Sequence, residues 1–274
     1  MTMSIPAADG TLLAAERAGE GPVELLLLHA GVADRRSWLP AMELLAGRYG
    51  SVAFDRPGYG GTAPAAAPYS AVEHVRAVAA AVAPGRPLVL VGNSMGGRIA
   101  IDAALAGPGL VRALVLVAPA VGGEPPVDWD AELGGDLVQE IEAAEEAGDL
   151  ERLNAFDARI WLDGPRSPEG RVGGAARALF REMDAIALVN GAQAPELEAG
   201  AAWGRLRELP MPVLVVSGEL DVATISARCS EIATAVADGR HVELAGVAHL
   251  PALEAPGAFA EVLLPFLDEV LGGR

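Results

Sequence analysis

The sequence predicts an α/β protein with a mostly parallel sheet and helices on both faces of that sheet. Short apolar runs alternate with helical patterns towards both ends of the chain, and parallel strands need such helical crossovers between them. The 274 residues, 51% of them hydrophobic, are enough to bury a large core. A central stretch without strand patterns, residues 121–205, predicts one helical insertion between two strands of the sheet.

The predicted strands are near-continuous apolar runs, which are typical of strands buried on both faces. The weaker "GTLLAAERAG" near the start predicts an antiparallel strand at the edge of the sheet. Parallel strands are expected at 23–30, 51–55, 87–93, 111–119, 212–218 and 241–246. Helices are expected at 70–82, 95–106, about 226–237, and 256–271, where Pro256 stands near the first turn.

The insertion opens with the breaker cluster "GGEPPVDWD" and is expected to form a helical cap on a core domain made of residues 1–120 and 206–274. Most of its large apolar side chains should pack the cap onto the core, while some line an apolar pocket, because ligand sites favour domain junctions. Trp129 and Trp161 are the candidates for substrate contact. Helical patterns run near 130–147, 149–161, 172–190 and 195–208, and the other large apolar residues are Phe156, Phe180, Met183 and Trp203.

Charge and composition exclude several classes of function. The net charge is −17, and all twenty basic residues are arginines. Without a lysine, neither Schiff-base chemistry on lysine nor a P-loop is possible. An acidic chain without a basic tract is a poor candidate for binding nucleic acid or an anionic membrane, so the expected partner is a small-molecule substrate.

The cysteine count and the apolar runs bear on the compartment. Cys229 is the single cysteine, so an intrachain disulfide and a cysteine-based zinc site are both excluded. The first ten residues do not have the pattern of a signal peptide, and the longest apolar runs are too short to span a bilayer. We therefore expect a cytoplasmic protein that does not contact membranes, as a monomer or a homodimer.

Ser94 is the candidate nucleophile. The segment "GNSMG" fits the pattern Gly-x-Ser-x-Gly and stands between a predicted strand and a predicted helix, as that pattern requires. Gly92 and Gly96 allow strand and helix to approach closely, and the helix N-terminus points free N–H groups towards developing negative charge. The alternative is a tight turn in which the serine has only a structural role.

A serine needs a base, and the chain has four histidines. His249 follows the last predicted strand, at the sheet edge where the carboxyl ends of parallel strands meet, so it can reach Ser94. His74 falls within a helix, and His241 opens a strand at the opposite end of the sheet. His29 stands at the correct end but belongs to a different motif.

The histidine in turn needs an orienting carboxylate. Asp221 follows a predicted strand in "VLVVSGELD", and the order nucleophile, acid, histidine along the chain favours it. Glu219 is its local rival and is expected to close the turn or cap a neighbour. Asp55 ends another strand within a loop-forming segment, while Glu124 and Asp128 rank lower because two glycines precede them.

Acyl transfer also needs N–H donors for the oxyanion. Met95, the residue after the nucleophile, supplies one backbone N–H. The second is expected from the loop "HAGVAD" after an early strand, where Gly31 allows close approach of a ligand. The alternative for Gly31 is a simple turn.

Taken together, these residues resemble the α/β-hydrolase superfamily, and more narrowly its small bacterial esterase, lactonase and C–C hydrolase branch. The resemblance covers residues 11–120 and 210–271 through "LLLLHAG", "FDRPGYGGT", "VGNSMGGRIAI", "VLVVSGELD" and "GVAHLPALEAP". It implies an eight-stranded sheet, a helical cap, and a triad of Ser94, Asp221 and His249. In the usual His-Gly-x pattern the third residue donates to the oxyanion; here Ala30 replaces the glycine, and Gly31 takes the donor position.

Three functions are compatible with these features. The first is hydrolysis of a small, largely apolar ester or lactone through an acyl-enzyme, with no metal or cofactor required. The second is C–C hydrolysis or lyase chemistry on a carboxylated diketone, because "GNSMGGR" is similar to the elbow of the menaquinone-pathway lyase. Arg98 would then hold the carboxylate, unless it merely pairs with a nearby acid. The third is a ligand receptor on a hydrolase scaffold.

Overall fold

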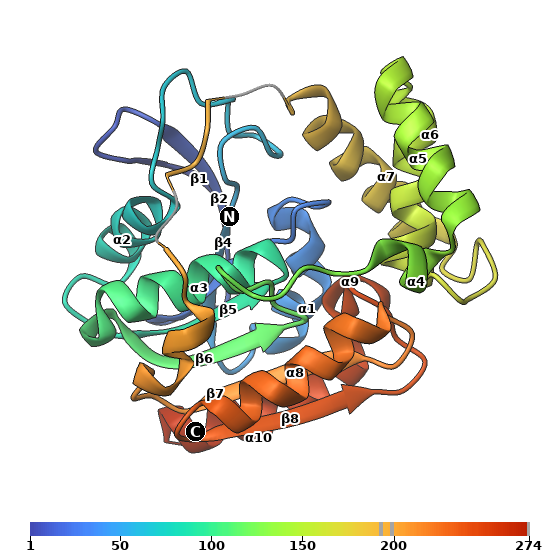
Figure 1. Cartoon of the computed structure of the whole chain (residues 1–274). Coiled ribbons are helices and arrows are strands. Elements are labelled where there is room, and N and C mark those ends of the chain that lie inside the picture. Colours follow the sequence, from blue (N-terminus) through green and yellow to red (C-terminus); the bar gives the residue numbers. More distant parts are fainter. Residues whose placement is uncertain (192–193, 198–199, 273–274) are drawn as a thin grey trace.

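The computed structural model describes residues 1–191, 194–197 and 200–272, and its centre is one eight-stranded sheet (Figure 1). The strand order is β1-β2-β4-β3-β5-β6-β7-β8, and β3 to β8 run parallel. This confirms the predicted fold class. β2 is antiparallel, as predicted, but it lies between β1 and β4 and not at the predicted edge. The strands are β1 (Thr2–Pro6), β2 (Leu12–Ala18), β3 (Val23–Leu28), β4 (Gly50–Phe54), β5 (Leu88–Asn93), β6 (Val111–Val117), β7 (Val213–Gly218) and β8 (Gly239–Leu244).

The sequence patterns missed β1 as an individual strand. It pairs with β2 at the edge of the sheet, and Ile5 is its only fully buried residue. A strand with so little buried apolar surface carries almost no hydrophobic pattern, and the pairing with β2 determines its conformation.

Helices cover both faces of the sheet. The side chains of Leu26 and Leu28 pack with α2, α3 and α8 on one face, and those of Leu25 and Leu27 pack with α1 and α10 on the other. The helices outside the insertion are η1 (Arg35–Trp38), α1 (Leu39–Leu45), α2 (Ala71–Val82), α3 (Met95–Ala106), η2 (Pro108–Leu110), α8 (Ala223–Ala235), α9 (Pro251–Glu254) and α10 (Pro256–Leu271). None of the helices in the described part of the chain has the length and apolar character needed to cross a membrane.

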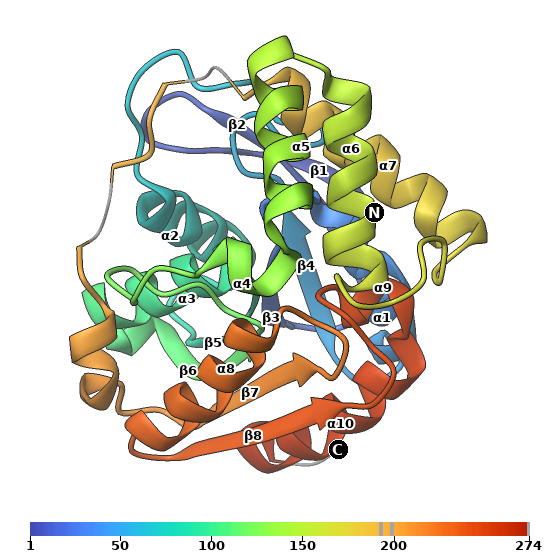
Figure 2. The same ribbon diagram turned by 45° about the vertical axis from the view of Figure 1, so that its right-hand side comes forward.

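A group of helices stands between β6 and β7 along the chain. Figures 1 and 2 show α5, α6 and α7 packed together outside the sheet, beyond the tips of its parallel strands. Phe180 and Met183 of α7 are fully buried in a cluster with Ala30, Ala33 and Leu250 from loops of the sheet. The elements are α4 (Trp129–Leu133), α5 (Gly135–Ala147), α6 (Leu150–Asp157), the π-helix η3 (Ala158–Asp163), α7 (Gly174–Val189) and the 3-10 helix η4 (Trp203–Glu208).

The last predicted helix of the insertion, 195–208, is largely wrong. Residues 194–197 are extended, and Glu196 forms a parallel bridge with Tyr69 of the core. The N–H of Leu197 donates to the Tyr69 carbonyl at 2.7 Å. Residues 198–199 lie outside the described part of the chain, and helical structure begins again only at η4. Backbone pairing with the core replaces the helix here, an effect that local sequence cannot reveal.

Candidate active site

Ser94 lies in a strained turn between β5 and α3. Its φ of 52° and ψ of −115° lie outside the regions that a non-glycine residue normally occupies. Such a conformation costs about 1–3 kcal/mol and persists only where its surroundings enforce it. The N–H of Ser94 donates to the Val117 carbonyl at 2.9 Å, and its own carbonyl accepts from Arg98 and Ala120 at 3.1 Å each. Neighbouring strands and the helix thus hold the serine in place.

The glycines around Ser94 are required by close backbone approach. A Cβ atom on Gly96 would lie well inside contact distance of the Leu28 carbonyl, and one on Gly92 would do the same with the Gly96 carbonyl. A Cβ atom on Gly97 would lie 2.6 Å from the Pro119 Cβ. These contacts agree with the prediction that the glycines allow the helix to pass close to the sheet.

His249 and Asp221 are hydrogen-bonded to each other. Nδ1 of His249 lies 2.8 Å from Oδ2 of Asp221, and both side chains are buried. Because an ionised carboxylate only accepts, Nδ1 carries the proton, and Nε2 of a neutral ring is left as an acceptor. The other oxygen of Asp221 accepts from the Val222 N–H at 2.8 Å. This pair has the arrangement of a general base and its orienting acid.

Two residues that the sequence analysis did not single out hold the histidine loop. The Asn93 amide, directly before the serine, donates to the carbonyls of Val117 at 3.0 Å and His249 at 3.1 Å. A Cβ atom on Gly218 would collide with the carbonyl of Ala248, so this glycine brings the loop close to β7. The sequence does contain one sign of this role, because Asn93 is a polar residue at the end of an otherwise apolar strand.

Glu254 supports the same loop from α9. Its Oε1 accepts from the Ala248 N–H at 2.6 Å, and its Oε2 accepts from Arg171 of the insertion at 2.5 Å. Burial raises the pKa of Glu254, while the hydrogen bond from Arg171 opposes that rise. Arg171 also donates to the Gly246 carbonyl at 2.9 Å, so the insertion is bound directly to the loop that carries His249.

His29 is unsuited to act as the base because both of its ring nitrogens are occupied. Nδ1 donates to the Ala30 carbonyl at 2.8 Å, and Nε2 accepts from the Arg56 N–H at 3.1 Å. The ring is fully buried, and that burial, with the nearby Arg56 charge, lowers its pKa well below the ordinary value. His29 therefore stays neutral and shapes the loop that carries Gly31.

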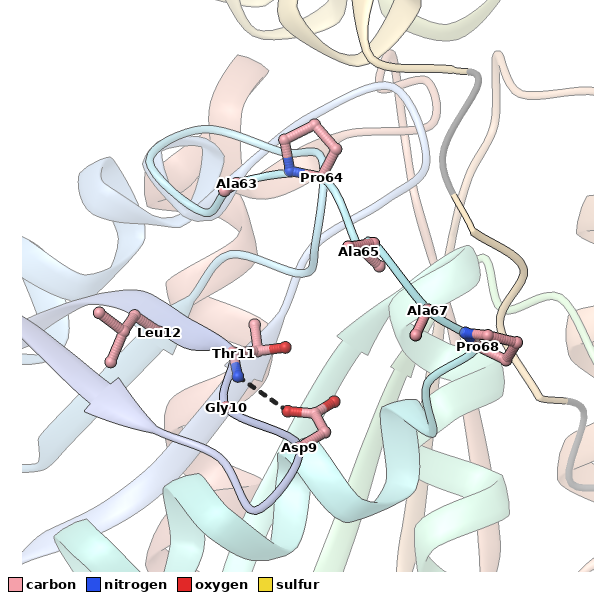
Figure 3. Close-up of a pocket in the computed structure, with 10 residues that line it drawn as sticks. Asp9, Gly10, Thr11, Leu12, Ala63, Pro64, Ala65, Ala67 and Pro68 are labelled. Atoms are coloured by element: carbon pink, nitrogen blue, oxygen red, sulfur yellow. Dashed lines mark hydrogen bonds between the residues drawn. The ribbon is translucent and has the colours of Figure 1, made fainter.

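The other two histidines contact different residues. His241 lies within β8, not at its first residue as expected, and its Nε2 is 2.8 Å from the Ser217 hydroxyl. His74 on α2 pairs with Asp9 at 2.8 Å. Asp9 borders a hollow of about 400 Å³ between the β1–β2 turn and residues 63–68, where it accepts from the Thr11 N–H (Figure 3). The residues that line this hollow do not include Ser94, Asp221 or His249.

The rival carboxylates all have structural partners. Glu219 accepts from the Gly246 N–H at 2.8 Å and closes a turn, as expected. Asp55 is fully buried and accepts from the N–H groups of residues 35 and 61, which organises its loop. Asp128 caps α4, and Glu124 pairs with an arginine of α8 at 3.4 Å.

Met95 and Gly31 are free to donate their backbone N–H groups. Met95 is the first residue of α3, where an N–H has no partner within the helix. Gly31 lies in the loop after β3, and an added Cβ atom would meet nothing within 4 Å. Within the described residues, neither N–H donates to another protein group.

Arg98 is engaged by two acids. Its guanidinium is 3.3 Å from Asp102 on the same helix and 2.5 Å from Glu196 of the insertion, and its Nε contacts the Met95 sulfur at 3.1 Å. Arg98, Glu196 and Met95, the residue after Ser94, border a cavity of about 550 Å³. A substrate carboxylate would have to compete with both ion pairs for this guanidinium.

Trp129 and Trp161 lie together in the insertion. Their rings meet edge to face at 6.0 Å, and both border a cavity of about 350 Å³ with mainly apolar walls. The Trp161 ring also lies 4.7 Å from the His249 ring. The cavity therefore shares one wall, Trp161, with the histidine.

A parallel sheet with a strained serine turn at the end of β5 and a histidine–carboxylate pair at the same edge defines an α/β hydrolase. The chain belongs to the alpha/beta hydrolase family, whose model matches residues 25–262. It is an enzyme of the hydrolase class.

The chain is similar to known hydrolases over almost its whole length. It is 26% identical to a pimeloyl-[acyl-carrier protein] methyl ester esterase of Aeromonas hydrophila, covering 92% of this chain and 98% of the relative. It is also 26% identical to a 2-(acetamidomethylene)succinate hydrolase of Mesorhizobium japonicum, covering 91% and 89%. The crystal structure of the esterase RhEst1 from Rhodococcus sp. superimposes with a TM-score of 0.75 at 26% identity, covering 98% and 99%.

Proposed function

We propose that this hydrolase cleaves a small, largely apolar carboxylic ester or lactone through an acyl-enzyme, with Ser94 as nucleophile, His249 as base and Asp221 as orienting acid. One observation carries the proposal: the strained Ser94 turn stands at the same sheet edge as the His249–Asp221 hydrogen bond. Similarity to two esterases supports ester hydrolysis.

In the proposed mechanism, Nε2 of His249 takes the Ser94 proton while the hydroxyl attacks the substrate carbonyl. Asp221 holds the imidazole through Nδ1 and stabilises its charged form. His249 then gives the proton to the leaving alcohol, and the same ring activates the water that releases the acid. The pathway needs neither a metal nor a cofactor.

The N–H groups of Met95 and Gly31 are proposed to stabilise the oxyanion. Removing one such donor typically costs about 2.7–4 kcal/mol of transition-state stabilisation. Met95 adds the positive end of the α3 dipole to this site. The absence of a protein partner for either N–H among the described residues supports the assignment.

The helical insertion, residues 121–205, is proposed to act as a cap that selects the substrate. Its apolar cavity beside Trp161 supports an uncharged chain or ring on the substrate. Trp129 and Trp161 are the proposed substrate contacts. We keep the cytoplasm as the proposed location, because the single cysteine suits a reducing compartment.

A carboxylated substrate cleaved by the same triad is the second candidate. It is favoured by the similarity to a relative named for a substituted succinate. Arg98 would be the carboxylate ligand, but its pairing with Asp102 and Glu196 weighs against that role.

The deciding experiment compares the wild-type enzyme with Ser94→Ala on aryl esters of graded chain length, lactones and diketo acids. We expect turnover of the esters by the wild type and a loss of about 10⁴-fold or more in the variant. A fluorophosphonate probe should label the wild type and not the variant. Full esterase activity in Ser94→Ala would refute the mechanism, and capture of a ligand without turnover would instead favour a receptor.

A further inference from the structure

Trp161 connects the insertion to the histidine through its backbone and its ring. Its carbonyl accepts the His249 N–H at 3.3 Å, and its ring lies against the His249 ring. Its indole N–H donates to Oδ1 of Asp157 at 3.1 Å. Because the indole is donor only, this bond fixes the direction in which the ring points.

The backbone around Trp161 departs from an α-helix. The π-helix η3 begins directly after Asp157, and π-turns are rare and frequently occur at functional sites. Gly164 follows η3 with a φ of 90°, and a Cβ atom there would collide with the Leu220 carbonyl, one residue before Asp221. The segment that carries Trp161 therefore packs against both loops that carry the base and its acid.

Asp157 is itself held in an acidic environment. Burial and the charge of Glu145 on α5 together raise its pKa to about 6, although the bond from Trp161 opposes the rise. Burial and the charge of Asp157 likewise raise the pKa of Asp184 on α7 to about 8. Glu142 of α5 and Asp157 both border the cavity beside Trp129 and Trp161. Arg181 of α7 donates to Asn154 of α6, which in turn donates to Asp184 at 2.7 Å.

We propose that Asp157 is a positioning residue, which fixes the Trp161 indole against His249 and thereby sets the shape of the cavity that receives the apolar part of the substrate. The inference deepens the proposed function and rests on it. Asp157 keeps an oxygen that can accept the indole N–H whichever member of the acid pair holds the proton, so the bond does not depend on that assignment.

Asp157→Ala tests the proposal with aryl acetate and aryl hexanoate as substrates. We expect kcat/KM on the hexanoate to fall about tenfold, as for the loss of one buried hydrogen bond. The fall on the acetate should be smaller, because a short acyl chain does not reach the cavity. Asp157→Asn keeps an oxygen acceptor and should stay within about threefold of the wild type.

Two further variants separate positioning from general damage to the insertion. Trp161→Phe removes the N–H donor together with one of the two fused rings, so its loss on the hexanoate should be at least that of Asp157→Ala. Adding Asp157→Ala to Trp161→Phe should cause no further loss, because the bond is already gone. Glu146→Gln removes an exposed carboxylate from α5 outside the cavity, without touching the Trp161 bond, and should leave turnover of both esters unchanged.

A spectroscopic measurement distinguishes failure of this inference from failure of the proposed function. The edge-to-face pair of Trp129 and Trp161 should give a coupled signal in far-UV circular dichroism, which Ser94→Ala keeps and Asp157→Ala loses. Unchanged chain-length preference in Asp157→Ala would overturn the proposal, as would multiplicative losses in the double variant. If Asp157→Ala does not fold, Asp157→Leu, which keeps a side chain of similar shape without an acceptor, takes its place in the same comparison.

Discussion

Two aspartates in this enzyme each accept a hydrogen bond from an aromatic ring, and the surroundings of the two carboxylates differ. Asp221, at the end of β7, accepts from His249 and from the backbone N–H of Val222. Asp157, at the end of α6, accepts from Trp161 and faces the acids Glu145 and Asp184. The first carboxylate accepts one backbone N–H, whereas the second has two other acids as charged neighbours.

The difference shows how the same residue type can serve chemistry or positioning. A carboxylate that accepts from the backbone and from an imidazole can stabilise a charge that forms on that imidazole. The pKa of a carboxylate among other acids is raised. Such a carboxylate can orient an indole ring through a hydrogen bond, but it exchanges no proton with the indole, which is only a donor. The contrast predicts different consequences when each is replaced.

The largest effect should separate the two aspartates directly. Asp221→Asn should lower kcat by about 10⁴-fold, because an amide holds the histidine in the wrong tautomer. Asp157→Asn should stay within about threefold, because the indole still finds an oxygen acceptor. Steady-state kinetics on one aryl ester, with thermal unfolding as the control, checks both values. Losses of similar size would mean that the two carboxylates share one role.

Two glycines extend the comparison to folding stability. Gly96→Ala should reduce the free energy of unfolding by about 3 kcal/mol, because its Cβ atom would collide with the backbone after β3. Gly148→Ala, after α5, meets no atom within 4 Å and should cost only about 1 kcal/mol for its left-handed φ of 65°. Urea unfolding measures both. A larger loss at Gly148 would show that the close backbone contact at Gly96 does not decide the cost of adding a Cβ atom.

The acid pair of the insertion should make stability fall as pH rises. The folded pKa of Asp184, about 8, lies above the ordinary aspartate value, so between pH 4 and pH 8 the folded state binds more protons than the unfolded state. Stability is therefore full below about pH 4 and decreases up to about pH 8. At pH 8 the free energy of unfolding of Asp184→Asn, measured with urea, should exceed that of the wild type by about 1 kcal/mol or more. At pH 4 this difference should disappear. Parallel pH dependence of the two proteins would disprove this.

The smallest effect on activity is expected at Arg98. Arg98→Gln removes two largely buried ion pairs and leaves Asp102 without its guanidinium partner, so it should cost about 3 kcal/mol of stability. Activity on uncharged aryl esters should change less than about twofold, since the guanidinium pairs with Asp102 and Glu196. If the variant instead loses activity on carboxylated substrates alone, Arg98 is their ligand, and the second candidate function gains its missing support.

Most of the sheet and the main site candidates were predictable from local patterns. The parallel strands were located within two residues, because near-continuous apolar runs mark strands buried on both faces. Ser94 was visible because only glycines fit the close approach around it. Asn93 and Glu254 were not predictable, because each holds the His249 loop by a hydrogen bond to its backbone, which no periodic sequence pattern indicates. Asp157 and Asp184 were missed for the same reason: 27 residues separate them along the chain.

The sequence by itself determined the fold class, the serine turn, and which histidine and acid stand at the carboxyl edge of the sheet. Glycine spacing and strand order are local or topological properties, and both can be read from one chain. Only the tertiary structure decided that residues 194–197 pair with the core instead of forming a helix, and that Trp161 lies on His249. Both outcomes depend on contacts between segments distant in sequence, whose free energy exceeds local helix propensity.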